Sequence, residues 1–287
     1  MKIVTDSAAD LPLDEVNELG VTVAPLFINF PEGQVNSADL TPDEFYNRLE
    51  AMVPHIPTTS QPSAGVFSDL YSKLAELGEE ILSIHISSGL SGTLNSAQLG
   101  ASQAAKAMVS LVDSMTLSGG ERFQVLAAAR AVQAGWNKQH ILQWLTELRD
   151  QTEVIYTLET LTYLARGGRI GRVQALAGAL LGLKPIIHVA KHDGKYSTVG
   201  KARTISKALT TIAEHLKAQY DPHTPLWVTV LHGRFAEQAD VLAEMLRQTL
   251  NVAKLEVLRI SPVLGVHTGP GIVGAAVVPE KLLEDIR

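Results

Sequence analysis

The sequence contains no cysteine among its 287 residues. Disulfide bonds, thiolate zinc sites and cysteine nucleophiles are therefore excluded. It also lacks a run of basic residues, and its formal charge of −6 at pH 7 argues against nucleic acids and anionic membrane surfaces as partners. Its apolar stretches are broken by Gly, Lys or Pro well short of a membrane span, so we expect no transmembrane helix. A strand predicted from Lys2 leaves no room for a signal peptide, and we expect a cytoplasmic protein.

The composition that remains is that of an ordinary globular protein, with 46% hydrophobic and 19% charged residues. At this length we expect about two domains. Strand and helix patterns alternate up to Asp150, whereas after Glu153 a hairpin signal at Asp193-Gly194 precedes a strand–helix–strand pattern. We therefore predict an α/β protein: an N-terminal α/β domain with a mainly parallel sheet over residues 1–153, and a C-terminal α+β domain over residues 154–287.

The most informative stretch is the Gly- and Ser-rich turn Ser87–Thr93. It follows the apolar strand pattern Ile81–Ile86 and precedes an Ala-rich helix pattern, Leu94–Met108. Unpaired amides and the positive end of a helix dipole at such a turn favour a bound anion, and four hydroxyls, those of Ser87, Ser88, Ser91 and Thr93, add hydrogen-bond donors. A helix start that is merely capped by turn residues explains the same stretch equally well.

The turn does not match the common nucleotide motifs. No Lys follows Gly92 as a P-loop requires, and the glycine spacing is not that of a dinucleotide-binding fingerprint. It is one residue short of the nucleophile elbow G-x-S-x-G, because Thr93 stands where the last Gly belongs. Ser91 is therefore either a nucleophile or a donor to a bound ligand.

Two further segments offer polar groups. Pro54–Ser63 contains three prolines, which we expect to prevent regular structure, and presents the hydroxyls of Thr59 and Ser60. Ser261–Gly271 is predicted to be a second Gly/Ser/Thr-rich loop, and it carries His267. Taken alone, a histidine in such a loop more often bonds to the backbone than to a ligand.

Basic and acidic residues at several positions have ordinary explanations when each is taken alone. Arg169, in a glycine-rich segment, and Arg203, before a predicted helix, would usually be solvated surface charges. Asp6 and Asp113 each end a predicted strand, where α/β sheets place functional groups, although capping of a turn explains them as well. We expect the apolar stretch Ala175–Leu183 to belong to the core rather than to a ligand tunnel.

His188 and His192 are four residues apart, as metal ligands can be. They span the start of the predicted hairpin, however, and no third ligand is near them in the sequence. We therefore predict no metal site and no cofactor.

Taken together, the motifs resemble the DegV family of bacterial fatty-acid-binding proteins. The resemblance rests on an ordered set that runs from the first strand to the last: Thr5-Asp6-Ser7, Asp10-Leu11-Pro12, Thr59-Ser60-Gln61-Pro62-Ser63, Ser87–Thr93, Gly167-Gly168-Arg169-Ile170, Ala202-Arg203-Thr204 and Gly265–Gly271. It implies two α/β-type domains with a fatty acid between them, the tail in an apolar tunnel and the carboxylate held by hydroxyls and a histidine. The head-group ligands that it implies are Thr59, Ser60, Ser91 and His267.

The resemblance also implies partners. Some members present the bound fatty acid to a separate kinase that forms an acyl phosphate for phospholipid synthesis. A fatty acid kinase and an acyltransferase are therefore the expected partners, with at most transient contact with a membrane. Arg169 and Arg203 match the arginines that serve phosphoryl transfer or partner contact.

Two hypotheses of different classes follow. The first is a lipid-binding protein without enzymatic activity, which holds one long-chain fatty acid and offers its carboxyl group to a partner. The alternative is a serine hydrolase of acyl esters, with Ser91 as the nucleophile, His267 as the base and either Asp6 or Asp113 orienting it. Chain order does not separate them, because catalytic triads occur in several orders.

Overall fold

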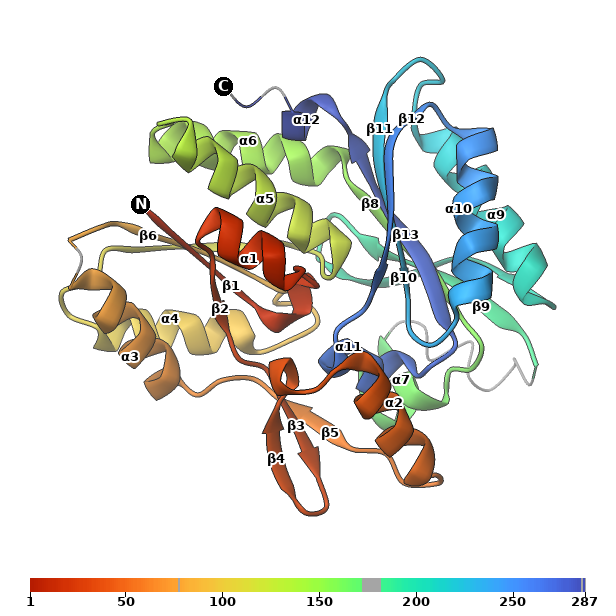
Figure 1. Ribbon diagram of the computed structural model, residues 1–287, viewed down its shortest axis with the longest axis horizontal. Helices are drawn as coiled ribbons and strands as arrows, with labels where there is room; N and C mark the ends of the chain where they lie inside the picture. Colours follow the sequence, from red (N-terminus) through yellow and green to blue (C-terminus); the bar gives the residue numbers. More distant parts are fainter. Residues whose placement is uncertain (77, 172–181, 285, 287) are drawn as a thin grey trace.

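The computed structural model describes residues 1–76, 78–171, 182–284 and 286. The N-terminal part contains a four-stranded parallel sheet in the order β2-β1-β6-β7 (Figure 1). Its strands are β1 (Lys2–Asp6), β2 (Thr22–Ala24), β6 (Ile81–His85) and β7 (Val109–Asp113), and its helices are α1 (Leu13–Leu19), α3 (Ala64–Ala75), α4 (Thr93–Gln103), α5 (Gly119–Gln133) and α6 (Lys138–Gln151). The isoleucine-rich β6 is an inner strand that is buried along its whole length, as its apolar pattern predicts.

The C-terminal part contains a mixed six-stranded sheet in the order β10-β9-β8-β13-β11-β12. Its strands are β8 (Glu153–Leu158), β9 (Lys184–Ala190), β10 (Lys195–Ala202), β11 (Leu226–His232), β12 (Val252–Arg259) and β13 (Ile272–Pro279), and its helices are α7 (Thr162–Arg166), α9 (Ile205–Gln219), α10 (Ala236–Thr249), α11 (Pro262–Thr268) and α12 (Lys281–Glu284). β9 and β10 form the predicted hairpin, whose turn contains Gly194 at φ +63°. The two-part α/β architecture with parallel and mixed sheets agrees with the predicted fold class.

Helix α5 lies between the two sheets and explains why they form one compact unit (Figure 1). Twelve of its residues are buried. A single hydrophobic cluster joins residues of β1 and β6, of α5 and α6, and of β8, β11 and β13. The core is therefore continuous across the predicted boundary after residue 153, and that boundary stays a prediction.

A buried arginine in α5 links the two parts electrostatically. The Arg122 side chain is fully buried and donates to Glu15 of α1 through Nε, at 2.8 Å from Oε2, and to Glu256 of β12 through a terminal nitrogen, at 2.5 Å from Oε1. It also donates to Thr229 Oγ1 at 3.2 Å. The two carboxylates offset the cost of burying this cation.

Three short strands form a small antiparallel sheet beneath the main body: β3 (Phe27–Phe30), β4 (Gly33–Asn36) and β5 (Thr58–Ser60). The 3-10 turns η1 (Ser7–Ala9) and η2 (Ser37–Asp39) and helix α2 (Pro42–Ala51) complete the N-terminal part, and α2 begins with the capping box of Thr41 and Glu44. The expectation that prolines prevent regular structure across Pro54–Ser63 is wrong at β5. Its three residues lie between Pro57 and Pro62, so their amides remain available to pair with β3.

The predicted loop Ser261–Gly271 is also wrong, because it contains the helix α11. Pro262 occupies its first turn, and Gly269, at φ +72°, ends it. Gly265 lies within α11. A Cβ at this position would overlap Phe45 of α2, so the glycine permits close packing of the two helices instead of marking a turn. The predicted helix Leu94–Met108 is shorter than expected and ends at Gln103.

Two other expectations can be compared with the structure only within the described residues. Of the apolar stretch Ala175–Leu183, residues 175–181 lie outside the described residues. Within the ranges that are described, none of the helices unites the length and the apolar character that a membrane crossing requires.

Candidate functional site

One pocket of about 520 Å³, part of it open solvent, collects most of the predicted site residues. Thr59, Ser60, Ser91 and His267 all line it, although they come from β5, the turn before α4, and α11. Arg169 lines it too. We refer to this cavity as the polar pocket. Segments more than 200 residues apart in the chain thus meet at one place, because α11 packs beside β5 and η1.

The centre of the polar pocket is a hydrogen bond between two of the predicted ligands. His267 Nε2 lies 2.7 Å from Thr59 Oγ1, while His267 Nδ1 is buried against Gly167 and has no hydrogen-bond partner among the described residues. Burial and the positive charge of Arg169 lower the pKa of His267 to about 4. The imidazole is therefore neutral at pH 7, so that one ring nitrogen carries a proton and the other is an acceptor.

The glycine-rich segment before Arg169 has a geometric explanation. A Cβ on Gly167 would overlap the His267 ring, so only glycine permits this approach. Gly168 adopts φ +70°, a conformation that glycine tolerates best. Arg169 then turns back and donates to the Gly167 carbonyl at 2.8 Å. This places a cation at the polar pocket, and sequence reasoning had assigned that cation to phosphoryl transfer or partner contact.

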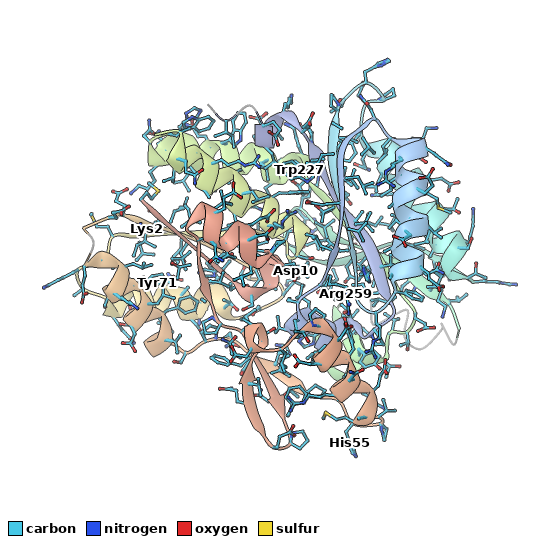
Figure 2. The ribbon with its side chains drawn as sticks, in the orientation of Figure 1. Lys2, Asp10, His55, Tyr71, Trp227 and Arg259 are labelled. Atoms are coloured by element: carbon cyan, nitrogen blue, oxygen red, sulfur yellow. The ribbon has the colours of Figure 1, made fainter. Side chains whose placement is uncertain are left out.

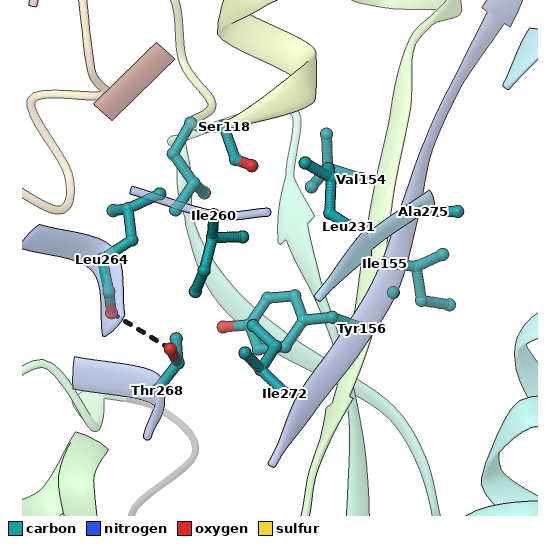
Figure 3. Close-up of a pocket in the computed structure, with 12 residues that line it drawn as sticks. Ser118, Val154, Ile155, Tyr156, Leu231, Ile260, Leu264, Thr268, Ile272 and Ala275 are labelled. Carbon is teal, nitrogen blue, oxygen red and sulfur yellow. Dashed lines mark hydrogen bonds between the residues drawn. The ribbon is translucent and has the colours of Figure 1, made fainter. Parts of the chain in front are cut away.

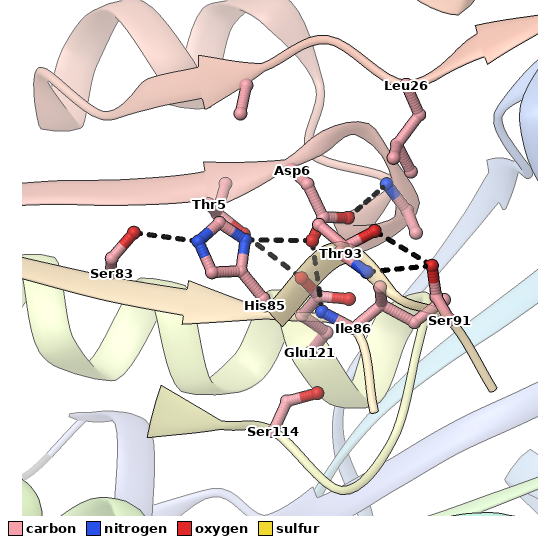
Figure 4. A network of polar contacts seen from close by, with 12 residues as sticks. Thr5, Asp6, Leu26, Ser83, His85, Ile86, Ser91, Thr93, Ser114 and Glu121 are labelled. Carbon is pink, nitrogen blue, oxygen red and sulfur yellow. Dashed lines mark hydrogen bonds and ion pairs between the residues drawn. The ribbon is translucent and has the colours of Figure 1, made fainter. Parts of the chain in front are cut away.

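Most hydroxyls of the turn Ser87–Thr93 form hydrogen bonds with other residues of the protein. Ser87 Oγ donates to the Gly194 carbonyl at 2.8 Å, and Ser88 Oγ donates to Asp113 at 2.5 Å. Neither therefore serves as the head-group donor that the hydroxyl count suggested. Ser91, by contrast, lines the polar pocket, with its Oγ 2.8 Å from Thr93 Oγ1 (Figure 4). It directly precedes α4, whose positive dipole end favours an anion there.

Ser60 and Arg203 do not lie as the residues predicted for the same roles do: Ser60 differs from Thr59, and Arg203 from Arg169. Side chains alternate along β5, so those of Thr59 and Ser60 point to opposite faces. The Ser60 hydroxyl accepts a hydrogen bond from Gln34 Nε2 at 3.0 Å on the outer face. Arg203 is exposed at the end of β10 and does not line the polar pocket. The structure therefore separates Arg203 from Arg169.

Asp10 positions the helix that carries His267. Asp10 lies at φ 52° after η1, and α1 begins with Pro12 as its N-cap residue. The Asp10 carboxylate accepts from the backbone amide of Ser261, at 2.7 Å, and from Ser118 Oγ, at 2.5 Å. Burial raises its pKa to about 6, against the lowering effect of these hydrogen bonds. Its central place in the molecule is visible in Figure 2.

A second, apolar pocket of about 400 Å³, part of it open solvent, adjoins the polar one. The two share Leu264 and Thr268 of α11 in their walls. Apart from Ser118, Tyr156 and Thr268, the residues around the apolar pocket are Leu, Ile, Val, Ala and Gly, from β8, β11, β13, α11 and the segments before α5 and after β12 (Figure 3). The Tyr156 hydroxyl points toward α11, and its ring packs edge-on against Tyr196, which lines the polar pocket.

The residues proposed for a hydrolase do not form a triad. No hydrogen bond joins Ser91 to His267 among the described contacts, since Ser91 bonds to Thr93 and His267 to Thr59. Asp6 accepts from the amide of Ala8, and Asp113 from that of Met115, so both cap turns. This is the simpler of the two explanations that the sequence left open.

A Ser-His-Asp chain does occur elsewhere, in the interior of the N-terminal sheet. Ser83 Oγ lies 2.7 Å from His85 Nε2, and His85 Nδ1 lies 3.0 Å from Asp6 Oδ2 (Figure 4). Tyr71 extends the chain with its hydroxyl 2.8 Å from Ser83 Oγ. Ser83 and His85 are fully buried and Asp6 is 1% exposed, so no substrate reaches this serine. The chain is structural.

Sequence reasoning missed several residues of the polar pocket. Gln61 and Leu90 were present in the motifs that carried the resemblance, but their roles were not assigned. Tyr196 was hidden in the hairpin, and Thr268 in the unrecognised helix. Burial raises the pKa of Tyr196 to about 12, so its hydroxyl stays protonated at neutral pH.

Comparison with known sequences gives the relatives of this chain. A family model described as "Uncharacterised protein, DegV family" matches residues 1–280. A DegV domain-containing protein of Deinococcus radiodurans is 37% identical over 277 residues, which cover 96% of this chain and 95% of the relative. Another, from Clostridium perfringens, is 35% identical over 280 residues, which cover 97% and 98%.

Solved structures with the same fold have described ligands. The chain matches a DegV family protein from Thermus thermophilus, described by its fatty acid binding, at TM-score 0.90 and 34% identity over 97% of this chain and 99% of that chain. It matches DegV from Bacillus subtilis, described as a fatty acid binding protein, at 0.87 and 30% over 96% and 98%. It matches a stearic acid-binding protein from Eubacterium ventriosum at 0.88 and 28% over 97% and 98%. All three are described by what they bind and not by a reaction.

Proposed function

Because this chain belongs to the DegV family, we propose that it binds a long-chain fatty acid across its two adjoining pockets. The carboxylate occupies the polar pocket beside Thr59, Ser91 and His267, and the tail extends past α11 into the apolar pocket. The observation that carries this proposal is the shared wall at Leu264 and Thr268, where polar groups give way to an apolar lining. An amphipathic ligand with one acidic end matches that change.

The energetics divide between the two ends of the ligand. Each charge-assisted hydrogen bond to the carboxylate contributes about 1.5–3 kcal/mol. A tail of about 14 methylenes contributes about 11 kcal/mol before the costs of association, which are about 4–15 kcal/mol. The tail therefore supplies most of the affinity, whereas the polar pocket fixes the position of the carboxyl group. Ser60 belongs to this pocket, but the outward direction of its hydroxyl makes Thr59 the stronger candidate ligand.

The proposal extends to partners. A carboxyl group held at the partly open polar pocket is accessible to a separate kinase, which would form an acyl phosphate for an acyltransferase. Arg169 lies beside the carboxylate and suits the neutralisation of a phosphoryl group. Arg203, exposed and outside the pocket, suits contact with the partner. We place this exchange in the cytoplasm, with at most transient contact with a membrane.

Mass spectrometry of gently purified protein tests the binding. We expect native spectra to contain one fatty acid per chain, and denaturing spectra to release it. After delipidation, added palmitate should restore the bound mass. A chain that is purified empty and also takes up no palmitate would refute the proposal.

A substitution in the apolar pocket tests the position of the tail. Leu231→Trp adds bulk to the wall of that pocket, whereas Val257→Trp adds the same bulk at an exposed position of β12. We expect the first variant to lose palmitate while it retains a shorter acid such as octanoate, and the second to behave as wild type. Equal retention of palmitate by both variants, with folding confirmed by circular dichroism, would place the tail elsewhere.

A further inference from the structure

Three side chains with nitrogen and oxygen ligand atoms converge on the side of the mixed sheet away from the fatty-acid pockets. Glu153 Oε1 lies 2.8 Å from His188 Nδ1 and 3.2 Å from His215 Nε2. One ligand atom from each residue lies within 4.8 Å of the others. None of the three lines either pocket, so the proposed fatty-acid site does not account for the cluster.

The fold explains how residues 62 positions apart meet. His188 pairs with Ile155 across β9 and β8, so their side chains share one face of the sheet, and Glu153 shares that face because it lies two residues before Ile155. Helix α9 covers this face with the apolar residues of a common cluster. His215, near the C-terminal end of α9, reaches the start of β8, where Glu153 and His188 lie on adjacent inner strands.

We propose that Glu153, His188 and His215 form a binding site for a divalent transition-metal ion, with Zn²⁺ as the ion that fits it best. Two imidazoles and one carboxylate are a ligand set that Zn²⁺ accepts, with a water molecule in the fourth position. At tetrahedral zinc, neighbouring ligand atoms are about 3.3 Å apart, close to the two separations observed here. Such an ion would tether α9 to β8 and β9.

The charge at the cluster supports a cation. The Glu153 side chain is only 5% exposed, so its carboxylate is held in the interior beside the two imidazoles. The opposing group is Lys191, whose Nζ lies 3.7 Å from Glu153 Oε2 and donates to the Asp150 carbonyl. His188 remains 26% exposed, which leaves a path for the ion and for its water.

Metal titration of tag-free, chelator-treated protein tests the site. Zn²⁺ added in competition with a chromophoric chelator should bind at one ion per chain, and Co²⁺ should give the visible absorption of a four-coordinate complex. We expect His215→Ala and His188→Ala to weaken Zn²⁺ binding by about tenfold or more. His55→Ala removes an exposed histidine, labelled at the lower margin of the molecule in Figure 2, that is not part of the cluster, and it should leave binding unchanged.

A variant that is expected to bind Zn²⁺ more tightly than the wild type makes the test sharper. Lys191→Met removes the competing cation and should tighten Zn²⁺ binding, which a merely structural hydrogen-bonded cluster would not do. Zn²⁺ should also raise the melting temperature of the wild type and of His55→Ala, but not that of His215→Ala. Absence of a stoichiometric site in the wild type, or equal affinity of the wild type and both histidine variants, would overturn the proposal. No fatty acid is needed, so this result is independent of the lipid-binding test.

Discussion

Two buried histidines in this molecule each bond to a hydroxyl through one ring nitrogen, but they differ in the surroundings of the other ring nitrogen. His85 and His267 each lie 2.7 Å from a hydroxyl, those of Ser83 and Thr59. The second nitrogen of His85 lies 3.0 Å from Asp6, in the interior of the N-terminal sheet. The second nitrogen of His267 is buried against Gly167 without a hydrogen-bond partner among the described residues, and the His267 side chain lines the polar pocket.

The difference separates structure from binding. A buried polar network that is fully satisfied stabilises a fold, and the chain through His85 has this property although its residue types are those of a hydrolase triad. A buried nitrogen without a partner costs stability, and a ligand can compensate for that cost. The incomplete site, and not the one that looks catalytic, is therefore where we expect a molecule to bind.

The largest expected effect is on stability, at His85. His85→Ala leaves the Asp6 carboxylate buried with only the amides of Ile86 and Ala8 as donors, so we expect a loss of about 3–5 kcal/mol in the free energy of unfolding. Urea denaturation measures it. Tyr71→Phe removes only the outermost hydroxyl and should cost about 1 kcal/mol. Fatty-acid binding per folded molecule should not change in either variant, and a selective loss of binding would reverse the comparison.

The next effect is a pH dependence that His267 causes. Its pKa is about 4 in the folded protein against about 6.5 in the unfolded chain, so the unfolded chain binds more protons between these values. Stability that is complete above pH 6.5 is therefore lost as the pH falls toward 4, by about 2–3 kcal/mol. Urea denaturation of the wild type and of His267→Ala, measured from pH 7.5 to 4, should show that the wild type loses this much free energy of unfolding relative to the variant as the pH falls.

Other groups titrate in the same pH interval. Their contributions cancel in the difference between the stabilities of the wild type and His267→Ala. Asp10, with a raised pKa of about 6, loses its stabilising contribution as the pH rises, which is the opposite sign. Burial also raises the pKa of Glu121 well above its ordinary value. A constant difference in stability between the wild type and His267→Ala across the whole range would show that His267 is not neutral when folded.

The third effect is on the affinity for the ligand. His267→Ala removes one hydrogen bond to the carboxylate, so we expect palmitate to bind about tenfold to a hundredfold more weakly, with little loss of stability at pH 7. Displacement of a fluorescent fatty acid measures it. Because the tail is untouched, palmityl alcohol should lose less affinity than palmitate. An equal loss for both ligands would indicate damage to the apolar pocket instead.

The smallest effect is expected at Thr59. Thr59→Val keeps the shape of the side chain and removes a neutral hydroxyl, so we expect affinity to fall about fivefold, by about 1 kcal/mol. Thr58→Val is the matched control, because the Thr58 hydroxyl accepts from Asn29 on the exposed outer face of β5. The same displacement assay applies to both. A larger effect at Thr58 than at Thr59 would place the ligand on the other face of this small sheet.

The sequence predicted the elements with a clear period and most of the residues that meet at the pocket. The buried strand at Ile81 and the hairpin around Gly194 are both present. It did not predict α11, because the glycines at 265 and 269 look alike in sequence although one permits helix packing and the other ends the helix.

Side-chain direction and distant contacts were beyond the sequence. Nothing in it indicated that Ser60 points away from Thr59, since the pairing of β5 with β3 decides that alternation. Likewise, Arg169 and Arg203 follow similar motifs, and only the folded chain places one at the pocket and leaves the other exposed. His188 had no third ligand nearby in sequence because Glu153 and His215 approach it through the sheet and α9.

The buried Arg122 also determines how the molecule can open. Its guanidinium connects α1 and β12 through two carboxylates on either side of α5. Parting the two sheets along that line would separate this buried cation from Glu256 while it kept Glu15, and removing a counterion from a buried charge is costly. We therefore expect the two parts to stay together when a ligand enters, so that an entry route would open at the periphery of the molecule.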